Sequence, residues 1–104
     1  MFFENIDKVK LNNMIKENKN IVLLDVRENY EFKEKNIKNS INIPLHELMF
    51  RVDELYEYKN SEIVCICSGG KRSMIACQTL YEEGFLNLYN LEKGLNNYFN
   101  LIWL

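Results

Sequence analysis

The sequence has little of what identifies membrane, secreted or metal-binding proteins. No stretch approaches the ~20 apolar residues that span a bilayer, and residues 1–5 lack the basic start and long apolar core of a signal peptide. Cysteine occurs three times, an odd number that favours free thiols over a disulfide framework, and histidine occurs once. These few groups form no metal-ligand pattern. We therefore expect a cytoplasmic protein that binds neither a metal nor a membrane.

An excess of positive charge is also lacking. Lys and Arg number 13 against 15 Asp and Glu, so the formal net charge is -2, and no basic stripe is visible. Non-specific binding of nucleic acid depends on surplus Lys and Arg, so we expect no nucleic-acid partner. At 104 residues, with 47% hydrophobic and 27% charged residues, the chain is typical of one globular domain over residues 1–104.

The apolar pattern alternates between short strands and helices. Short apolar runs predict strands at residues 21–24, 40–43, 62–66 and 86–91. Helical spacing predicts helices at residues 7–17, 28–35, 73–83 and 94–104, and one or two helices at 45–58. Gly84 suits the end of the fourth helix. This alternation indicates an α/β fold, a central parallel sheet flanked by helices on both faces, with ligands at the carboxyl ends of the strands.

One stretch combines a nucleophile with a tight turn and two cations. Cys67 follows the third predicted strand, and Ser68, Gly69, Gly70, Lys71, Arg72 and Ser73 lead into the next helix, with Ser73 as its predicted cap. Two glycines let the loop curl, so that its N–H groups and those of the first helical turn point at the centre. Together with the adjacent cations, these donors favour a thiolate, and Cys67 is the candidate nucleophile.

The remaining polar and sulfur-containing candidates have structural interpretations. We expect Cys65 and Cys77 to be small core residues and His46 to be a surface or capping residue. Asp25 ends the first predicted strand, and Arg27 and Glu31 are four residues apart, a spacing at which they could pair on a short helix. The favoured interpretation of these last three residues is a cap and an ion pair near the Cys67 loop, in preference to direct catalysis.

Several ordered motifs resemble those of the rhodanese-type sulfurtransferases. The stretch 67–73, CSGGKRS, is similar to the C-x-x-G-x-R-S active-site signature of that family. The stretches 24–32, 40–44 and 84–94 resemble its D-V-R-x-x-x-E-[FY], A-x-N-I-P and G-F-x-x-V-x-x-L-x-G-G elements. The resemblance covers nearly the whole chain from residue 21 onward, and ordered motifs at matching separations are far more specific than one alone.

Four positions depart from the family pattern. Lys35 and Asn36 replace the usual Gly-His, Asn39 stands where glycine is frequent, and Lys93 replaces the first glycine of the final pair. None of these departures lies in the Cys67 loop. They concern local turn geometry and substrate access, whereas the chemistry that the resemblance implies depends on the loop itself.

The resemblance implies a rhodanese-like fold and sulfur transfer through a Cys67 persulfide. The sulfur would come from thiosulfate or a persulfide donor and pass to a thiol, cyanide or a protein acceptor, with no cofactor. Loop N–H groups between Ser68 and Ser73 would stabilise the anionic persulfide, and Lys71 and Arg72 would bind the small anionic donor.

Two other functions remain open. A cysteine phosphatase or arsenate reductase of related fold also uses a thiolate in an anion cradle, but those loops have five residues between cysteine and arginine, and here there are four. A non-enzymatic module that binds or senses persulfides is the third possibility, although the cysteine that catalysis needs is present.

Overall fold

The structure, a computed structural model, describes residues 2–100 and contains eleven short elements in alternation. The strands are β1 (Glu4–Ile6), β2 (Val22–Asp25), β3 (Ile41–Asn42), β4 (Ile63–Ile66) and β5 (Leu88–Leu91). The helices are α1 (Lys8–Glu17), α2 (Asn29–Glu34), α3 (Leu45–Arg51), the 3-10 helix η1 (Val52–Tyr58), α4 (Lys71–Glu82) and α5 (Gly94–Tyr98).

Most of the predicted elements are present, with two differences. Strand β1 was not predicted, because it has three residues and buries only Ile6, which leaves too little apolar pattern to recognise. The last helix was predicted over 94–104, but α5 ends at Tyr98, and residues 101–104 lie outside the described residues. The segment 45–58 divides into α3 and η1, in agreement with the prediction of one or two helices.

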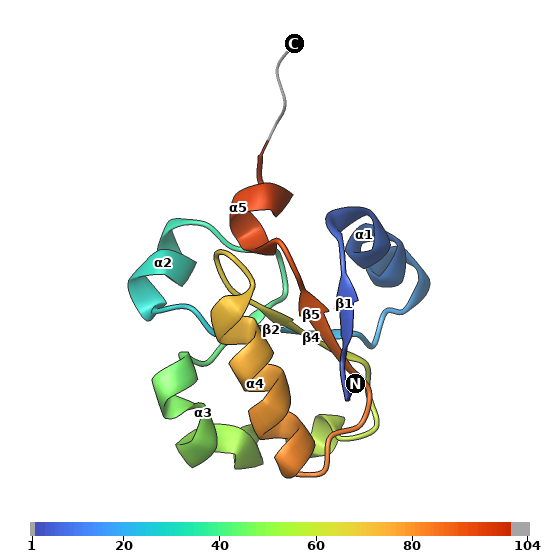
Figure 1. Cartoon of the computed structure of the whole chain (residues 1–104), viewed down its shortest axis with the longest axis vertical. Helices are drawn as coiled ribbons and strands as arrows, with labels where there is room; N and C mark the ends of the chain where they lie inside the picture. The colour runs from blue at the N-terminus through green and yellow to red at the C-terminus, as the bar shows by residue number, and fades with distance from the viewer. Residues whose placement is uncertain (1, 101–104) are drawn as a thin grey trace.

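The five strands form one parallel sheet in the order β1-β5-β4-β2-β3 (Figure 1). Strand β4 lies in the middle, where Ile63 pairs with Val22 on one side and with Leu88 on the other. All four residues of β4 are buried, as expected for a parallel strand covered on both faces. The predicted fold class is confirmed.

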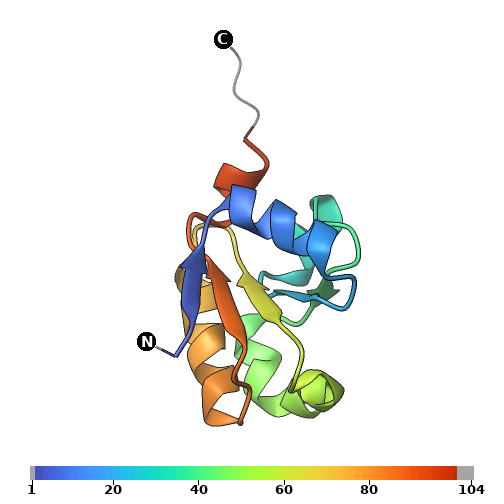
Figure 2. The same ribbon diagram turned by 90° about the vertical axis from the view of Figure 1, so that its right-hand side faces the viewer.

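Alternate residues of β4 enter two separate cores. Ile63 and Cys65 belong to a core formed with α3, η1 and α4, whereas Val64 and Ile66 belong to a core formed with α1 and α5. Figures 1 and 2 show α1 and α4 on opposite sides of the sheet. Cys77 on α4 is fully buried in the first core, so both cysteines predicted as core residues are core residues.

Two turns outside the Cys67 loop and its contact with α5 have a left-handed backbone. Gly84 follows α4 with a φ of 94°, which confirms its predicted place at the end of that helix. Asn39 has a φ of 71°. Asparagine is one of the few residues other than glycine that tolerates this region, so the departure at position 39 keeps the turn that glycine would make. None of the helices among residues 2–100 has the length and apolar character that a membrane crossing needs.

Candidate active site around Cys67

Cys67 lies directly after the central strand β4, in the loop that leads into α4. In Figure 1 this loop curls at the end of the sheet below α5. In open parallel sheets, ligands bind at the carboxyl ends of the strands. Cys67 therefore lies at the edge of the sheet at which the sequence predicted it.

Three polar groups converge on the Cys67 sulfur. The backbone N–H of Gly70 donates to Sγ at 3.1 Å, and the N–H of Ser73 donates to it at 3.3 Å. The Ser73 hydroxyl oxygen lies 3.3 Å from the same sulfur. Only 1% of the surface of Cys67 is exposed. A negative charge on this sulfur would be stabilised by preorganised donors with little contribution from water.

Helix α4 begins earlier than predicted, and Ser73 is not its cap. Gly70 occupies the cap position, the helix starts at Lys71, and Ser73 lies inside the first turn, fully buried. With Gly70 as the cap, Ser73 is the third helical residue, and its N–H is one that the side chain of the capping residue usually accepts. Gly70 has no side chain, and the Cys67 sulfur accepts this N–H in its place.

Close packing of α5 on the loop makes two glycines necessary. The N–H groups of Leu95 and Asn96 donate to the carbonyls of Cys67 and Ser68 at 2.9 and 3.0 Å. A Cβ on Gly94 would lie 2.2 Å from the Ser68 carbonyl oxygen, and a Cβ on Gly70 would lie 1.9 Å from the Glu92 carbonyl oxygen. Both glycines have positive φ. A Cβ on Gly69 would meet nothing within 4 Å, so of the glycine pair only Gly70 is sterically constrained.

Arg72 is held by a carboxylate rather than aimed at the sulfur. Its guanidinium donates to both Glu31 oxygens, at 2.9 and 3.3 Å, and to the Ser68 hydroxyl at 3.1 Å. The Ser68 hydroxyl also donates to Glu31 at 3.2 Å. The hydrogen bond from Arg72 is the main cause that lowers the pKa of Glu31 to about 2, and Glu31 in turn raises the pKa of Arg72. This cluster ties α2 to the loop.

The predicted pairing of Arg27 with Glu31 is wrong. The Arg27 side chain donates to Asp25, with Nη2 to Oδ2 at 2.9 Å, and to the Lys35 carbonyl at 2.6 Å. Glu31 instead accepts the N–H of Glu28, which fixes it in the first turn of α2, and reaches Arg72. Asp25 and Arg27 are buried, and their contacts brace the turn after β2.

The remaining candidates lie at the surface. Lys71 is exposed at the first position of α4. His46 is also exposed and faces Glu28 and Glu47, with nitrogen to oxygen distances of 3.3 and 3.5 Å, which agrees with its predicted surface location. Among residues 2–100, no three His, Cys, Asp or Glu side chains are grouped as a metal site.

Sequence reasoning missed Asn90. This residue of β5 is 1% exposed, and its Oδ1 accepts the Ser73 hydroxyl. Its Nδ2 donates to Asn5 Oδ1 at 3.0 Å and to the Gly70 carbonyl at 3.3 Å. The available signal was an amide inside an otherwise apolar strand, because a buried polar side chain needs partners and these lie at the Cys67 loop.

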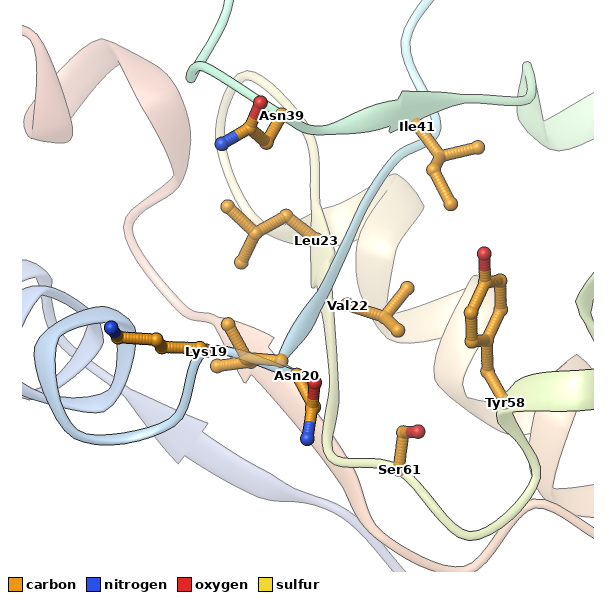
Figure 3. A pocket seen from close by; sticks show the side chains of 9 residues that line it. Lys19, Asn20, Val22, Leu23, Asn39, Ile41, Tyr58 and Ser61 are labelled. Atoms are coloured by element: carbon orange, nitrogen blue, oxygen red, sulfur yellow. The ribbon is translucent and has the colours of Figure 1, made fainter.

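A separate cavity of about 510 Å³ lies at the opposite end of the sheet (Figure 3). Its walls include Val22, the first residue of β2, and Ser61, which precedes β4, together with Tyr58 and Ile41. None of its lining residues belongs to the Cys67 loop. Its position at the amino ends of β2 and β4 distinguishes it from the candidate active site.

Comparison with known proteins identifies one family over most of the chain. A family model described as "Rhodanese-like domain" matches residues 7–101. A crystal structure of a rhodanese-related protein from Thermoplasma volcanium has a TM-score of 0.81 and 33% identity, and covers 92% of this chain and 90% of that one.

Two curated relatives carry different names. A protein named sulfurtransferase from Allochromatium vinosum is 28% identical over 90 residues, which are 86% of this chain and 82% of that protein. A tRNA uridine(34) hydroxylase from Buchnera aphidicola is 39% identical over 92 residues, which are 85% of this chain. The chain spans only 29% of the length of that hydroxylase.

Proposed function

The chain belongs to the rhodanese-like domain family, and from that premise we propose that it is a sulfurtransferase of the thiosulfate sulfurtransferase type that carries sulfane sulfur on Cys67. The observation that carries the proposal is the convergence of the Gly70 and Ser73 N–H groups on Sγ. Such donors suit an anionic sulfur, whether it is the thiolate or the persulfide that follows it. The relative named sulfurtransferase, matched over most of its length, supports the same activity.

The reaction requires two displacements at sulfur. In the first, the Cys67 thiolate attacks the outer sulfur of thiosulfate, the S–S bond of the donor breaks, and sulfite leaves with the electron pair. Cys67 then carries a persulfide. In the second, an acceptor such as cyanide or a thiolate attacks the terminal sulfur, and the Cys67 thiolate leaves and is regenerated. This is covalent nucleophilic catalysis, and it needs no external oxidant or reductant.

The two cations of the loop have different roles in this proposal. The charge of Arg72 is balanced by Glu31, so Arg72 mainly holds the loop against α2. Lys71 is exposed beside the loop and attracts the small anionic donor. A persulfide donor would carry the same negative charge as thiosulfate, so this attraction favours both. The acceptor is a thiol, cyanide or a protein thiol.

The alternatives have less support. An in-line phosphoryl or arsenate group needs a wider cradle than the four residues between Cys67 and Arg72 provide. The hydroxylase relative is matched over 29% of its length, and a net charge of -2 offers no surplus cations for RNA.

Three free cysteines fit a reducing cytoplasm, which we propose as the location.

The decisive experiment is the intact mass of the purified protein after incubation with thiosulfate. The proposal predicts one added sulfur atom that cyanide or a thiol reductant removes, with formation of thiocyanate in the cyanide case. The Cys67→Ser variant should gain no sulfur. If the unmodified protein gains none and forms no thiocyanate while remaining folded, the proposal is wrong, and the non-enzymatic module becomes the better interpretation.

A further inference from the structure

We propose that Asn90 is a positioning residue that controls how readily Cys67 ionises, because it holds the proton of the Ser73 hydroxyl away from the sulfur. The inference rests on the proposed role of Cys67 as the nucleophile. The Asn90 side chain makes no hydrogen bond to the Cys67 sulfur; its partners are Ser73, Asn5 and the Gly70 carbonyl. Its influence on the reaction passes through Ser73.

The orientation of the Asn90 amide is determined by its partners. The two protons on Nδ2 go to Asn5 Oδ1 and to the Gly70 carbonyl, both of which are acceptors. The other end of the amide, Oδ1, must therefore face Ser73 and can only accept. At 1% exposure, water does not compete effectively for these bonds. The amide is thus a fixed acceptor for the Ser73 hydroxyl.

The Ser73 hydroxyl has one proton and two acceptors within reach. Its oxygen lies 3.3 Å from Cys67 Sγ and is also bonded to Asn90 Oδ1. While the proton points to Asn90, the hydroxyl oxygen presents lone pairs to the sulfur, and the Cys67 S–H can donate to it. The result is a chain of donors that runs from Cys67 through Ser73 to Asn90, and it favours the neutral thiol.

Ionisation of Cys67 reverses this preference. An anionic sulfur needs the hydroxyl as a donor, so the Ser73 proton must turn toward Sγ and leave Asn90 Oδ1 without its partner. A buried acceptor that loses its hydrogen bond has a free-energy cost. Asn90 therefore opposes formation of the thiolate, while the Gly70 and Ser73 N–H groups favour it. These two sets of contacts therefore act in opposite directions on ionisation of Cys67.

The ionisable groups that surround the loop in the unmodified protein are retained in every variant used to test this idea, and only Asn90→Asp adds one. They come from β4, α2, α4 and the turn before α5, and they are Cys65, Glu31, Lys71, Arg72, Cys77, Glu92 and Lys93. Glu31 and Arg72 neutralise each other. The hydrogen bond with the neighbouring Cys77 thiol, together with burial, raises the pKa of Cys65, so Cys65 stays protonated near neutral pH.

The test is the pH dependence of alkylation of Cys67 by iodoacetamide, followed by peptide mass. Asn90→Leu keeps the approximate shape of the side chain and removes the acceptor. The pH at which alkylation reaches half of its maximal rate, here called the midpoint, should therefore fall by about half to one pH unit. Below the midpoint this corresponds to an increase of about three- to tenfold in the thiolate fraction. Asn90→Asp keeps an acceptor and adds negative charge, so the midpoint should rise. Asn5→Ala leaves the bond between Ser73 and Asn90 in place and should not move it.

A second comparison shows whether the effect passes through Ser73. In a Ser73→Ala background the downward shift caused by Asn90→Leu should disappear, and the upward shift caused by Asn90→Asp should become smaller. Should Asn90→Leu fail to fold, the Asn90→Asp pair still supplies this comparison. Equal shifts with and without the hydroxyl, or an upward shift in Asn90→Leu, would overturn the inference. Alkylation needs no sulfur transfer, so this outcome is independent of the persulfide assay.

Discussion

Glu31 and Arg72, which are 41 residues apart in the sequence, form a two-point ion pair, with Oε1 to Nη1 at 2.9 Å and Oε2 to Nη2 at 3.3 Å. The pair joins the first turn of α2 to the first turn of α4 and thereby fixes one side of the Cys67 loop. The guanidinium of Arg72 is therefore occupied by contacts that hold the loop.

This pair predicts a specific loss of stability in acid. The pKa of Glu31 is lowered from 4.5 to about 2, so the carboxylate stabilises the fold above pH 4.5, and this contribution is lost as the pH falls toward 2. We expect Glu31→Gln to reduce the free energy of unfolding near neutral pH by about 1 kcal/mol, after allowance for the partial exposure of Arg72. Urea unfolding at a series of pH values measures it.

The matched control for that prediction is Glu34→Gln, an exposed carboxylate at the end of the same helix. This variant should change the free energy of unfolding by less than ~0.5 kcal/mol and should keep the acid dependence of the unmodified protein. If Glu31→Gln loses as much stability between pH 4.5 and pH 2 as the unmodified protein does, the pair does not supply that stability.

Substitution of Lys71 and substitution of Arg72 should have different effects on the steady-state kinetics. Lys71→Ala removes an exposed attraction for an anion, so we expect a higher KM for thiosulfate, by about three- to tenfold at low salt, with kcat little changed. Arg72→Ala leaves Glu31 unpaired beside the loop, so it should lower kcat as well and slow alkylation of Cys67. Steady-state rates at several thiosulfate concentrations distinguish the two. A Lys71→Ala variant with an unchanged KM at low salt would remove the proposed role of that lysine.

The glycine pair offers a sharp comparison between neighbours. Gly70 has a φ of 97°, and its Cβ would collide with the Glu92 carbonyl, so Gly70→Ala should destabilise the protein by about 2 kcal/mol or more and abolish turnover. A Cβ on Gly69 meets nothing within 4 Å, so Gly69→Ala should stay within about 0.5 kcal/mol of the unmodified protein. Thermal unfolding and thiocyanate formation measure both. Equal losses in the two variants would contradict the steric argument.

The sequence predicted features that depend on residues close together in the chain, and it missed contacts between residues that are far apart in the chain. The strands and helices were recognisable because apolar spacing is local, and Cys67 was recognisable because its glycines and cations are adjacent to it. Glu31 was assigned to Arg27 because only near neighbours can be paired from spacing, whereas its real partner is on another element. Asn90 was missed for the same reason, since its contacts with Ser73 and Gly70 exist only after β4 and β5 pair.

The cysteines should differ completely in function. Cys67→Ser should lose sulfur transfer, whereas Cys65→Ser and Cys77→Ser should retain the persulfide on Cys67, because the loop N–H groups of Gly70 and Ser73 converge on the Cys67 sulfur alone. Placing a hydroxyl in the apolar core should lower the melting temperature of these two variants. Activity is therefore compared at a temperature at which both variants are folded. Thiocyanate formation and peptide mass locate the sulfur. Transfer that persists in Cys67→Ser but vanishes in a folded Cys65→Ser would reverse the assignment.

The size of the Cys67 loop should determine whether the site accepts a sulfane sulfur atom or a phosphoryl group. Four residues separate Cys67 from Arg72, and the sulfur is 1% exposed between the Gly70 and Ser73 N–H groups. A persulfide adds one atom to the sulfur, whereas an in-line phosphoryl group must place three further oxygens around it. Charge cannot discriminate, because both ligands are anions and Lys71 attracts either. The discrimination must therefore come from steric exclusion.

We accordingly expect thiosulfate sulfurtransferase activity and no hydrolysis of aryl phosphates by the unmodified protein. Insertion of one glycine between Gly69 and Gly70 should widen the ring of N–H donors, depress sulfur transfer at least tenfold and allow phosphate to inhibit alkylation of Cys67. The same insertion in a Cys67→Ser background controls for contaminating phosphatase. Robust aryl phosphate hydrolysis by the unmodified protein, lost in Cys67→Ser, would show that a loop of this size admits a phosphoryl group, and the phosphatase interpretation would then take first place.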